Sequence, residues 1–296
     1  MTDIYMDPSN APAGETRNTL MEKEALRVEH LSIAFGGLKA VDDLTFTVRE
    51  KEIFGLIGPN GAGKTTVFNC ITQFYKPNSG NVFFRTDADR MAKSKRQTED
   101  ESQVINLVGK PVHKIIRYGL VRTFQNVEII KELSLIDNVL VGAHIDFKAT
   151  VFEQALKLPR ARREEREIRA RAEKALEFFG IADRKDLPAG GQPYGVLKKV
   201  ELARTLLTNP KLIIMDEPAA GLNDVETQEL AELIRAIRDT YNCTILLVEH
   251  DMRLVMGVCD RICAISFGKF LACDVPAGIQ TNKLVQEAYL GEEEGE

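Results

Sequence analysis

The strongest chemical signal in the sequence is a glycine-rich stretch, Gly58-Pro-Asn-Gly-Ala-Gly-Lys-Thr65, which matches the pattern G-x-x-x-x-G-K-[S/T]. It lies between the apolar run "IFGLIG", which predicts a buried strand, and "TTVFNCITQFY", which has helical spacing. Gly61 and Gly63 allow backbone N–H groups to converge on phosphate oxygens, and the N-terminus of the following helix adds positive charge. The stretch therefore predicts a site for a nucleoside triphosphate, in which Lys64 reaches the β- and γ-phosphates and Thr65 binds Mg²⁺. The predicted nucleotide-binding residues here are Gly58, Pro59, Asn60, Gly61, Ala62, Gly63, Lys64, Thr65 and Thr66.

Two more apolar runs end in side chains that suit phosphate chemistry. In "LIIMDEP" the run is followed by Asp216 and Glu217, and in "TILLVEHD" a second run leads to His250. Two adjacent carboxylates can divide the work, so that Asp216 holds Mg²⁺ while Glu217 orients or deprotonates the attacking water. Asp-Glu-Pro also fits a simple strand-end turn, and a lone histidine is more often structural. Their positions after buried strands favour catalysis at Glu217 and a γ-phosphate contact at His250.

The elements around these residues predict an α/β fold. "LRVEHLSIAF" and "LTFTVRE" alternate apolar and polar residues, as half-buried strands do. After Lys199 the pattern alternates helices with the strands "KLIIMD", "TILLVEH" and "RICAISF". Such alternation predicts a parallel sheet covered by helices, which a mostly helical lobe interrupts. No internal repeat is visible, so the chain contains one nucleotide-binding unit.

Changes of composition along the chain suggest its organisation. The first residues are rich in Asn, Pro, Thr and Glu, and "RTDADRMAKSKRQTEDESQ" is strongly polar. The charged stretch 152–179 has helical spacing throughout. The predicted parts are a flexible tail (1–25), a single nucleotide-binding domain (26–290) with a core (26–125 and 200–275), a helical subdomain (126–199) and a polar insertion (86–105), and an acidic tail (291–296).

Composition limits the classes of function. The chain has 296 residues, of which 44% are hydrophobic, which is enough for a sizeable core. Its net charge of −5 offers no global basic field, so nucleic acid is not expected as a partner. No apolar run approaches the roughly 20 residues that cross a bilayer. We therefore expect a cytoplasmic protein whose work at a membrane depends on other, membrane-spanning subunits. The five cysteines include no C-x-x-C pair and are expected to be mostly buried and reduced.

The motifs together resemble the ATP-binding-cassette (ABC) ATPase family. "GPNGAGKTT", "RTFQN", "MDEP", "AAGLN" and "VEHDM" occur in that family's order and approximate spacing, and the resemblance covers about residues 26–290. It implies a P-loop NTPase with a RecA-like parallel sheet, an N-terminal antiparallel β element and an inserted helical subdomain, which binds ATP and Mg²⁺. By position, Phe35 resembles the aromatic that stacks on adenine, although core packing is the alternative. Gln125 resembles the catalytic residue that joins Mg²⁺ to the helical lobe, and Asn223 lies in a loop facing the partner subunit, where the family commonly has Asp.

The family's signature turn has two candidates in "PAGGQPYGVLKKVELAR". In the family the signature directly precedes a helix that ends in Ala-Arg-Ala-Leu, and counting back from Arg204 places it on residues 192–196. "AGGQ" lies four residues too early, so we interpret it as a connecting loop. Tyr194 and Gly195 are then expected to meet the γ-phosphate bound to the other subunit. Pro193 lacks the hydroxyl and the N–H of the usual serine, which should impair the partner's site and favour a heterodimer over a homodimer.

Longer stretches indicate a subfamily. "YGLVRTFQNVEIIKELSLIDNVLVGAH" and "FGKFLACDVPAGIQTNKLVQEAYLGEE" resemble ATP-binding subunits of high-affinity branched-chain amino acid importers, the LivG-type group. That resemblance implies two permeases, a second ABC ATPase and an extracytoplasmic solute-binding protein as partners. We expect docking to the permease through the surface after Gln125, near Asn126 to Leu133, where apolar and acidic residues alternate. The "AYLG" segment is shared with the lipopolysaccharide-export ATPase, which remains an alternative. A non-transport ABC ATPase and a module that binds ATP without hydrolysis are further alternatives. The cargo touches the permeases and is not encoded in this chain.

Overall fold

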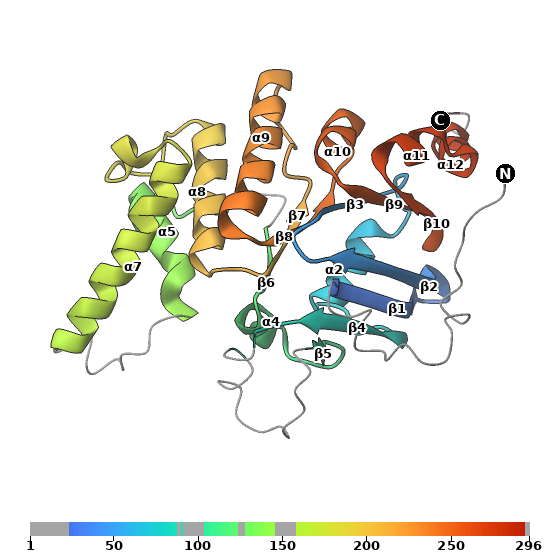
Figure 1. Cartoon of the computed structure of the whole chain (residues 1–296), viewed down its shortest axis with the longest axis horizontal. Helices are drawn as coiled ribbons and strands as arrows, with labels where there is room; N and C mark the ends of the chain where they lie inside the picture. The colour runs from blue at the N-terminus through green and yellow to red at the C-terminus, as the bar shows by residue number, and fades with distance from the viewer. Residues whose placement is uncertain (1–23, 88–89, 91–103, 124–127, 146–157, 294–296) are drawn as a thin grey trace.

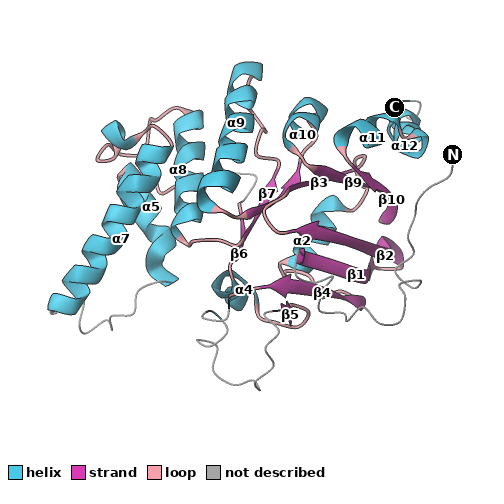
Figure 2. Ribbon diagram, in the orientation of Figure 1, coloured by secondary structure: helices cyan, strands magenta, loops and turns pink. Residues whose placement is uncertain are grey.

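The protein is built around two β-sheets, with a group of helices to one side of them (Figure 1). The computed structural model describes residues 24–87, 90, 104–123, 128–145 and 158–293. Figure 2 shows the helical group on the left, the larger sheet across the centre and the smaller sheet below it on the right. Among the described residues, no helix is both long and apolar enough to cross a bilayer.

The larger sheet has the strand order β10-β9-β3-β8-β7-β6. Its strands are β3 (Ile53–Ile57), β6 (Leu120–Arg122), β7 (Leu212–Asp216), β8 (Thr244–Val248), β9 (Arg261–Ser266) and β10 (Lys269–Asp274). All neighbouring pairs are parallel except β9 and β10, which form an antiparallel pair at one edge. Every residue of β3, β7 and β8 is buried, as expected of apolar strands that are covered on both faces. The parallel sheet that the sequence predicted is therefore present.

The smaller sheet is antiparallel and has the order β2-β1-β4-β5. Its strands are β1 (Glu24–Phe35), β2 (Leu38–Arg49), β4 (Ser79–Arg85) and β5 (Val104–Asn106). Gly36 and Gly37 join β1 to β2 with φ angles of 54° and 92°, a backbone that glycine adopts without strain and that suits a two-residue hairpin. This sheet contains the antiparallel N-terminal element predicted from the sequence, and β5 falls at the end of the polar stretch 86–105.

The helices divide into a group beside the sheets and a group that covers them. The first group contains α5 (Leu135–Val141), α7 (Pro159–Phe178) and α8 (Tyr194–Leu207), which pack on one another. Helix α8 runs across the boundary that we placed at 199/200, because its apolar face continues into the core up to Leu207. The remaining helices are α2 (Lys64–Ile71), α4 (Val112–Tyr118), α9 (Asp224–Tyr241), α10 (Met252–Val258), α11 (Pro276–Thr281) and α12 (Lys283–Glu293), with short 3₁₀ turns at Gly142–Ile145 and Ala182–Arg184.

The core forms two apolar layers, one on each face of the larger sheet. Side chains alternate along β3, so that Ile53 and Ile57 join the layer under α9 and α10, whereas Phe54 and Leu56 join the layer around α2 and the smaller sheet. Both layers hold the strands rigidly, which fixes the loops at their ends. Four of the five cysteines are buried and Cys273 is exposed, and all five are free thiols.

Candidate functional site

Three neighbouring strands bring the predicted site residues to one edge of the sheet. β3 lies beside β8 and β8 lies beside β7, all parallel, so their carboxyl ends face the same side. The glycine-rich loop follows β3, Glu217 follows β7, and His250 comes two residues after β8. In an open α/β sheet, ligands bind outside the carboxyl ends of the strands. The topology therefore assembles one site from residues that are far apart in the sequence.

Two glycines of the phosphate loop are required by close packing as well as by conformation. A Cβ on Gly58 would lie 2.2 Å from the carbonyl oxygen of Ile265, and one on Gly63 would lie 2.5 Å from that of Ala40. Gly63 has φ 99° and forms the N-cap of α2, where an L-residue would also be strained. The loop is thus pressed against the backbone of β2 and the end of β9.

Lys64 lies inside this loop. Only 6% of the residue is exposed, and its Nζ donates to the carbonyl oxygens of Gly58 and Pro59, the latter at 2.9 Å. A buried ammonium group together with the N-terminus of α2 concentrates positive charge at the loop. Thr65, by contrast, is exposed in the first turn of α2. The geometry suits the binding of an anionic phosphate chain.

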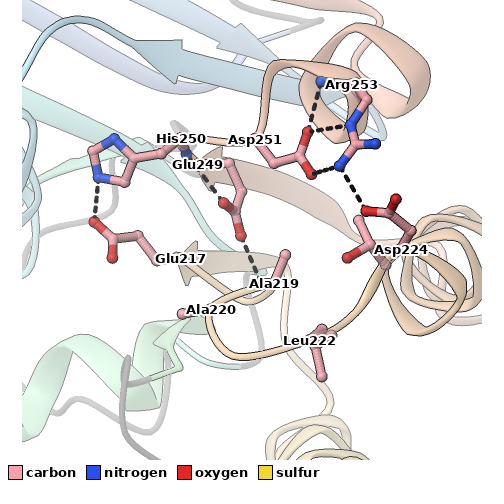
Figure 3. A pocket seen from close by; sticks show the side chains of 10 residues that line it. Glu217, Ala219, Ala220, Leu222, Asp224, Glu249, His250, Asp251 and Arg253 are labelled. Carbon is pink, nitrogen blue, oxygen red and sulfur yellow. Dashed lines mark hydrogen bonds and ion pairs between the residues drawn. The ribbon is translucent and has the colours of Figure 1, made fainter.

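The side chains of Glu217 and His250 lie within hydrogen-bonding distance of each other. His250 Nε2 lies 2.7 Å from Glu217 Oε1, although the two residues are 33 positions apart. Glu217 has φ 48°, a left-handed backbone that is uncommon for glutamate, and its N–H donates to the carbonyl oxygen of Val248 at 2.8 Å. This bond to β8 turns the carboxylate toward the end of the neighbouring strand. Figure 3 shows the two side chains pointing toward each other at one side of a cavity.

Asp216 is paired with an arginine that the sequence did not reveal as a site residue. Its carboxylate Oδ2 lies 2.5 Å from Arg122 Nη2, and both side chains are almost completely buried. Arg122 also donates to the side-chain oxygen of Asn69 in α2 at 2.7 Å. The arginine thereby connects β6, β7 and α2 beneath the site. Nothing in the spacing of "VRTFQN" signalled this, because the pairing arises from β6 lying next to β7 in the sheet.

The oxygen donors at the site fit Mg²⁺ carried by a nucleotide. The Thr65 hydroxyl and the Asp216 carboxylate are hard oxygen ligands, which Mg²⁺ prefers, and this ion usually takes only one or two protein ligands and keeps waters and phosphate oxygens. In the part of the chain that the structure describes, no group of three or more His, Cys, Asp or Glu gathers as a metal site. Gln125, predicted as a metal ligand and catalytic residue, lies outside the described residues.

Phe35 lies at the end of β1 and is accompanied by a second aromatic residue. The two rings of Phe35 and Tyr75 meet edge to face, with centroids 5.2 Å apart and an interplanar angle of 70°. Both remain exposed, at 47% and 41%, so Phe35 is not a core residue. An exposed aromatic surface of this kind suits stacking with a nucleobase. Tyr75 was missed because it follows α2, and only the fold brings it to β1.

The two glycine-bearing turns before α8 are distinguished by their backbone hydrogen bonds. In "AGGQ" the N–H groups of Ala189 and Gly190 donate to the carbonyl oxygens of Leu133 and Lys131, both at 2.9 Å, so the structure already uses them. Helix α8 begins at Tyr194, and its N-cap, Pro193, makes no side-chain capping bond. Figure 1 shows α8 to the left of α9, whereas α2, which follows the glycine-rich loop, lies below and to the right of α9.

Beside the Glu217–His250 pair lies a cavity of about 230 Å³. Glu249 in its wall is only 4% exposed and accepts hydrogen bonds from the N–H groups of Ala219, at 2.6 Å, and His250, at 3.1 Å. Burial raises the pKa of the Glu249 carboxyl, bonds from backbone N–H groups oppose this rise, and the charge of Glu217 adds to it. The residues that line the cavity are Glu217, Ala219, Ala220, Leu222, Asp224, Thr227, Glu249, His250, Asp251 and Arg253.

Comparison with known proteins is decisive for the family. A family model described as "ABC transporter" matches residues 41–220, which include the phosphate loop and Glu217. The chain belongs to the ABC transporter family. This ABC protein is 44% identical over 272 residues to the high-affinity branched-chain amino acid transport ATP-binding protein LivG of Salmonella typhimurium, covering 92% of this chain and 100% of the relative. With the same coverage it is 43% identical to LivG of Escherichia coli K12 and, over 92% of this chain, 42% identical to BraF of Pseudomonas aeruginosa.

Solved structures agree with this assignment. An ATP-binding cassette of an ABC transporter, crystallised in its ADP conformation, is 29% identical with a TM-score of 0.73, over 90% of this chain and 99% of the other. CbiO1 from Clostridium perfringens, part of the ABC transporter complex cbiONQ, is 26% identical with a TM-score of 0.70, over 92% and 100%. The family and the fold class predicted from the sequence are confirmed. Our ABC protein is an ATPase that binds ATP and couples its hydrolysis to transport.

Proposed function

We propose that this chain is the ATP-hydrolysing subunit of an importer for branched-chain or related amino acids. The observation that carries the proposal is the 2.7 Å contact between Glu217 and His250 at the carboxyl ends of strands that also present the Lys64 loop. A carboxylate beside a histidine at a phosphate site is equipped for hydrolysis as well as for binding. The full-length similarity to LivG and BraF, named as branched-chain amino acid transport proteins, supports this class of cargo.

Each group of the site has a role in this reaction. The loop amides and the Lys64 ammonium bind the phosphates, and Phe35 stacks on the base. Glu217 accepts a proton from the attacking water, while His250 Nε2 lies within reach to orient that water or the terminal phosphate. Thr65 and Asp216 would hold Mg²⁺, which supplies neutralising charge for the phosphate oxygens when it is bound. Gln125 stays a prediction for the same ion.

A second ABC ATPase subunit completes the proposed assembly. In this assembly the start of α8, with Tyr194 and Gly195, would contact the nucleotide that a partner chain binds. Pro193 has no N–H to donate, which favours an unequal pair in which this chain's Glu217 catalyses most of the hydrolysis. Asn223 is engaged locally, since its side chain accepts from the N–H groups of Val225 and Glu226 and caps α9.

Permease docking is proposed for the surface of residues 128–133, the described part of the predicted segment 126–133. Ile130 is 46% exposed there, in a segment that also carries acidic Glu128. Arg204 in α8 donates to the carbonyl oxygen of Glu128 at 2.7 Å and to that of Asn138 at 3.0 Å. The helix that begins with the signature turn is therefore bonded to the docking segment. We propose two permeases and, through them, an extracytoplasmic solute-binding protein as partners, with this chain on the cytoplasmic face of the membrane.

Purification of the complex from membranes, followed by mass spectrometry of its subunits, tests the assembly. Two different permeases and a second ABC ATPase are expected, whereas a single exporter pair would contradict the proposal. In the reconstituted complex, Glu217→Gln should lower ATP turnover by roughly 100-fold or more, the usual contribution of a general base. Glu229→Gln changes an exposed carboxylate of α9 and serves as the matched control. Unchanged turnover in Glu217→Gln would refute the catalytic assignment.

A further inference from the structure

The Glu249 carboxylate connects two backbone segments that carry the reacting side chains. One oxygen accepts from the Ala219 N–H at 2.6 Å, two residues after Glu217. The other accepts from the N–H of His250 at 3.1 Å. Figure 3 shows Glu249 between these two segments, with the Glu217–His250 contact on one side and Arg253 with its acidic partners on the other. A single side chain thus spans the turn after β7 and the turn after β8.

We infer that Glu249 is a positioning residue for ATP hydrolysis, which holds Glu217 and His250 at their working distance. The inference rests on the roles of Glu217 and His250 in the proposed function. The side chains of Glu217 and His250 are in contact at 2.7 Å, and both are partly exposed, Glu217 by 21% and His250 by 48%. Exposed side chains lose entropy when they are held in one geometry. A buried brace between their backbones supplies that restraint.

Glu249 does not itself abstract the proton from water. It is 4% exposed, and both of its oxygens accept hydrogen bonds from backbone N–H groups. A general base must reach the proton that it removes, at about 2.6–3.2 Å or through one water. Glu217, which faces His250, has the accessible carboxylate. Glu249 therefore acts through the placement of its neighbours.

The two donors require a group with two acceptor oxygens. Both Ala219 and His250 present N–H groups, and an ionised carboxylate only accepts. In glutamine, one oxygen becomes an NH₂ group, which would face an N–H donor without an acceptor between them. One backbone segment must then move away from the side chain. The change alters a single atom's hydrogen-bonding role and leaves the volume almost unchanged.

Steady-state ATP hydrolysis by the complete transporter complex tests the inference. For Glu249→Gln we expect kcat to fall by about tenfold, which corresponds to about 1.4 kcal/mol of activation free energy, with KM for ATP changed less than about twofold. Glu52→Gln is the matched control, because Glu52 is also buried with a raised pKa but lies before β3, at its opposite end from the phosphate loop. Glu249→Asp, whose shorter side chain keeps the charge but not the reach, should fall as far as Glu249→Gln.

A second measurement reports geometry in the isolated full-length chain. The protein has four histidines, so the ring ¹⁵N resonances can be assigned after histidine labelling. We expect Glu249→Gln to shift the Nε2 resonance of His250 and to leave the other three unchanged. Wild-type kcat in both Glu249 variants, or an unmoved His250 resonance in the folded variant, would overturn the inference. Equal losses of kcat and nucleotide affinity would do the same, since they indicate a general structural role. Failure of the proposed function would instead appear as absent hydrolysis in the wild-type complex.

Discussion

Replacement of Asn138 by alanine is expected to destabilise the protein strongly. Asn138 lies in α5 and is completely buried. Its amide oxygen accepts from the N–H of Ile130 at 2.9 Å, and its amide nitrogen donates to the carbonyl oxygens of Ile130 at 2.9 Å and Ser134 at 3.0 Å. A longer bond of 3.2 Å joins its oxygen to Arg204 Nη2. The side-chain amide of Asn138 is thus hydrogen-bonded both to the segment proposed to dock on the permease and to helix α8.

The magnitude follows from the bonds lost. Three bonds of 3.0 Å or less contribute about 1 kcal/mol each, so Asn138→Ala should cost about 3 kcal/mol of the free energy of unfolding. That is a large part of the roughly 5–15 kcal/mol that stabilises a typical native domain. For a chain of this size about 1 kcal/mol moves the melting temperature by roughly 2–4 °C, which predicts a fall of about 6–12 °C.

Differential scanning calorimetry of the purified chain checks this value. Gln228→Ala changes an exposed polar residue on α9 and should stay within about 0.5 kcal/mol of wild type. In reconstituted complexes at a temperature where Asn138→Ala is still folded, the ATPase activity should respond less to added transport substrate than in wild type. A melting temperature within about 2 °C of wild type would refute the reasoning that this buried amide organises the docking segment.

Three further outcomes are expected. Gly63→Ala should reduce MgATP affinity at least about tenfold in equilibrium binding, since its Cβ would lie 2.5 Å from the carbonyl oxygen of Ala40 at φ 99°; unaltered affinity would contradict the proposed cradle. Burial raises the pKa of Glu249 above its ordinary 4.5, so the folded state binds this proton more tightly, and the stability that this group contributes is lost as pH rises above that value. The Glu249→Gln variant lacks this titration, so the difference in melting temperature between wild type and variant should shift in favour of the variant between pH 4 and 7. A difference that stays constant with pH would argue against burial of a charged carboxylate. Combined Glu128→Arg and Ile129→Asp should leave ATPase activity intact but abolish transport in vesicles, and normal transport would move the docking surface elsewhere.

Local sequence was sufficient to predict the strands and turns that carry the proposed nucleotide site. The stretch Gly58 to Thr65 joins β3 to α2 as the motif requires, Asp216 is the last residue of the buried strand β7, and His250 comes two residues after the buried strand β8. The local structure around such a loop can be predicted because the motif is defined by short-range spacing and by glycine's conformational freedom. The roles of Phe35, Tyr194 and Gly195 also came from sequence, through resemblance, and stay predictions.

Other features depend on pairs of residues that are distant along the chain. Arg122 meets Asp216 because β6 lies beside β7, and Tyr75 meets Phe35 because α2 ends near the smaller sheet. Glu249 lies in the stretch "TILLVEHD", but the spacing of residues there does not predict that its carboxylate accepts a hydrogen bond from the N–H of Ala219. These contacts depend on which strands and helices become neighbours, and the packing of the whole core determines that arrangement.

The sequence by itself therefore determined the family and the α/β class, and it predicted the residues of the phosphate site, because these are encoded by short patterns of glycine, charge and apolar period. Only the tertiary structure decided that Glu217 lies 2.7 Å from His250. It also decided that the N–H groups of Ala189 and Gly190 in "AGGQ" donate to the carbonyl oxygens of Leu133 and Lys131. The physical reason is that strand pairing and helix packing act over long sequence separations. Hydrogen-bond satisfaction can be judged only when both partners are in place.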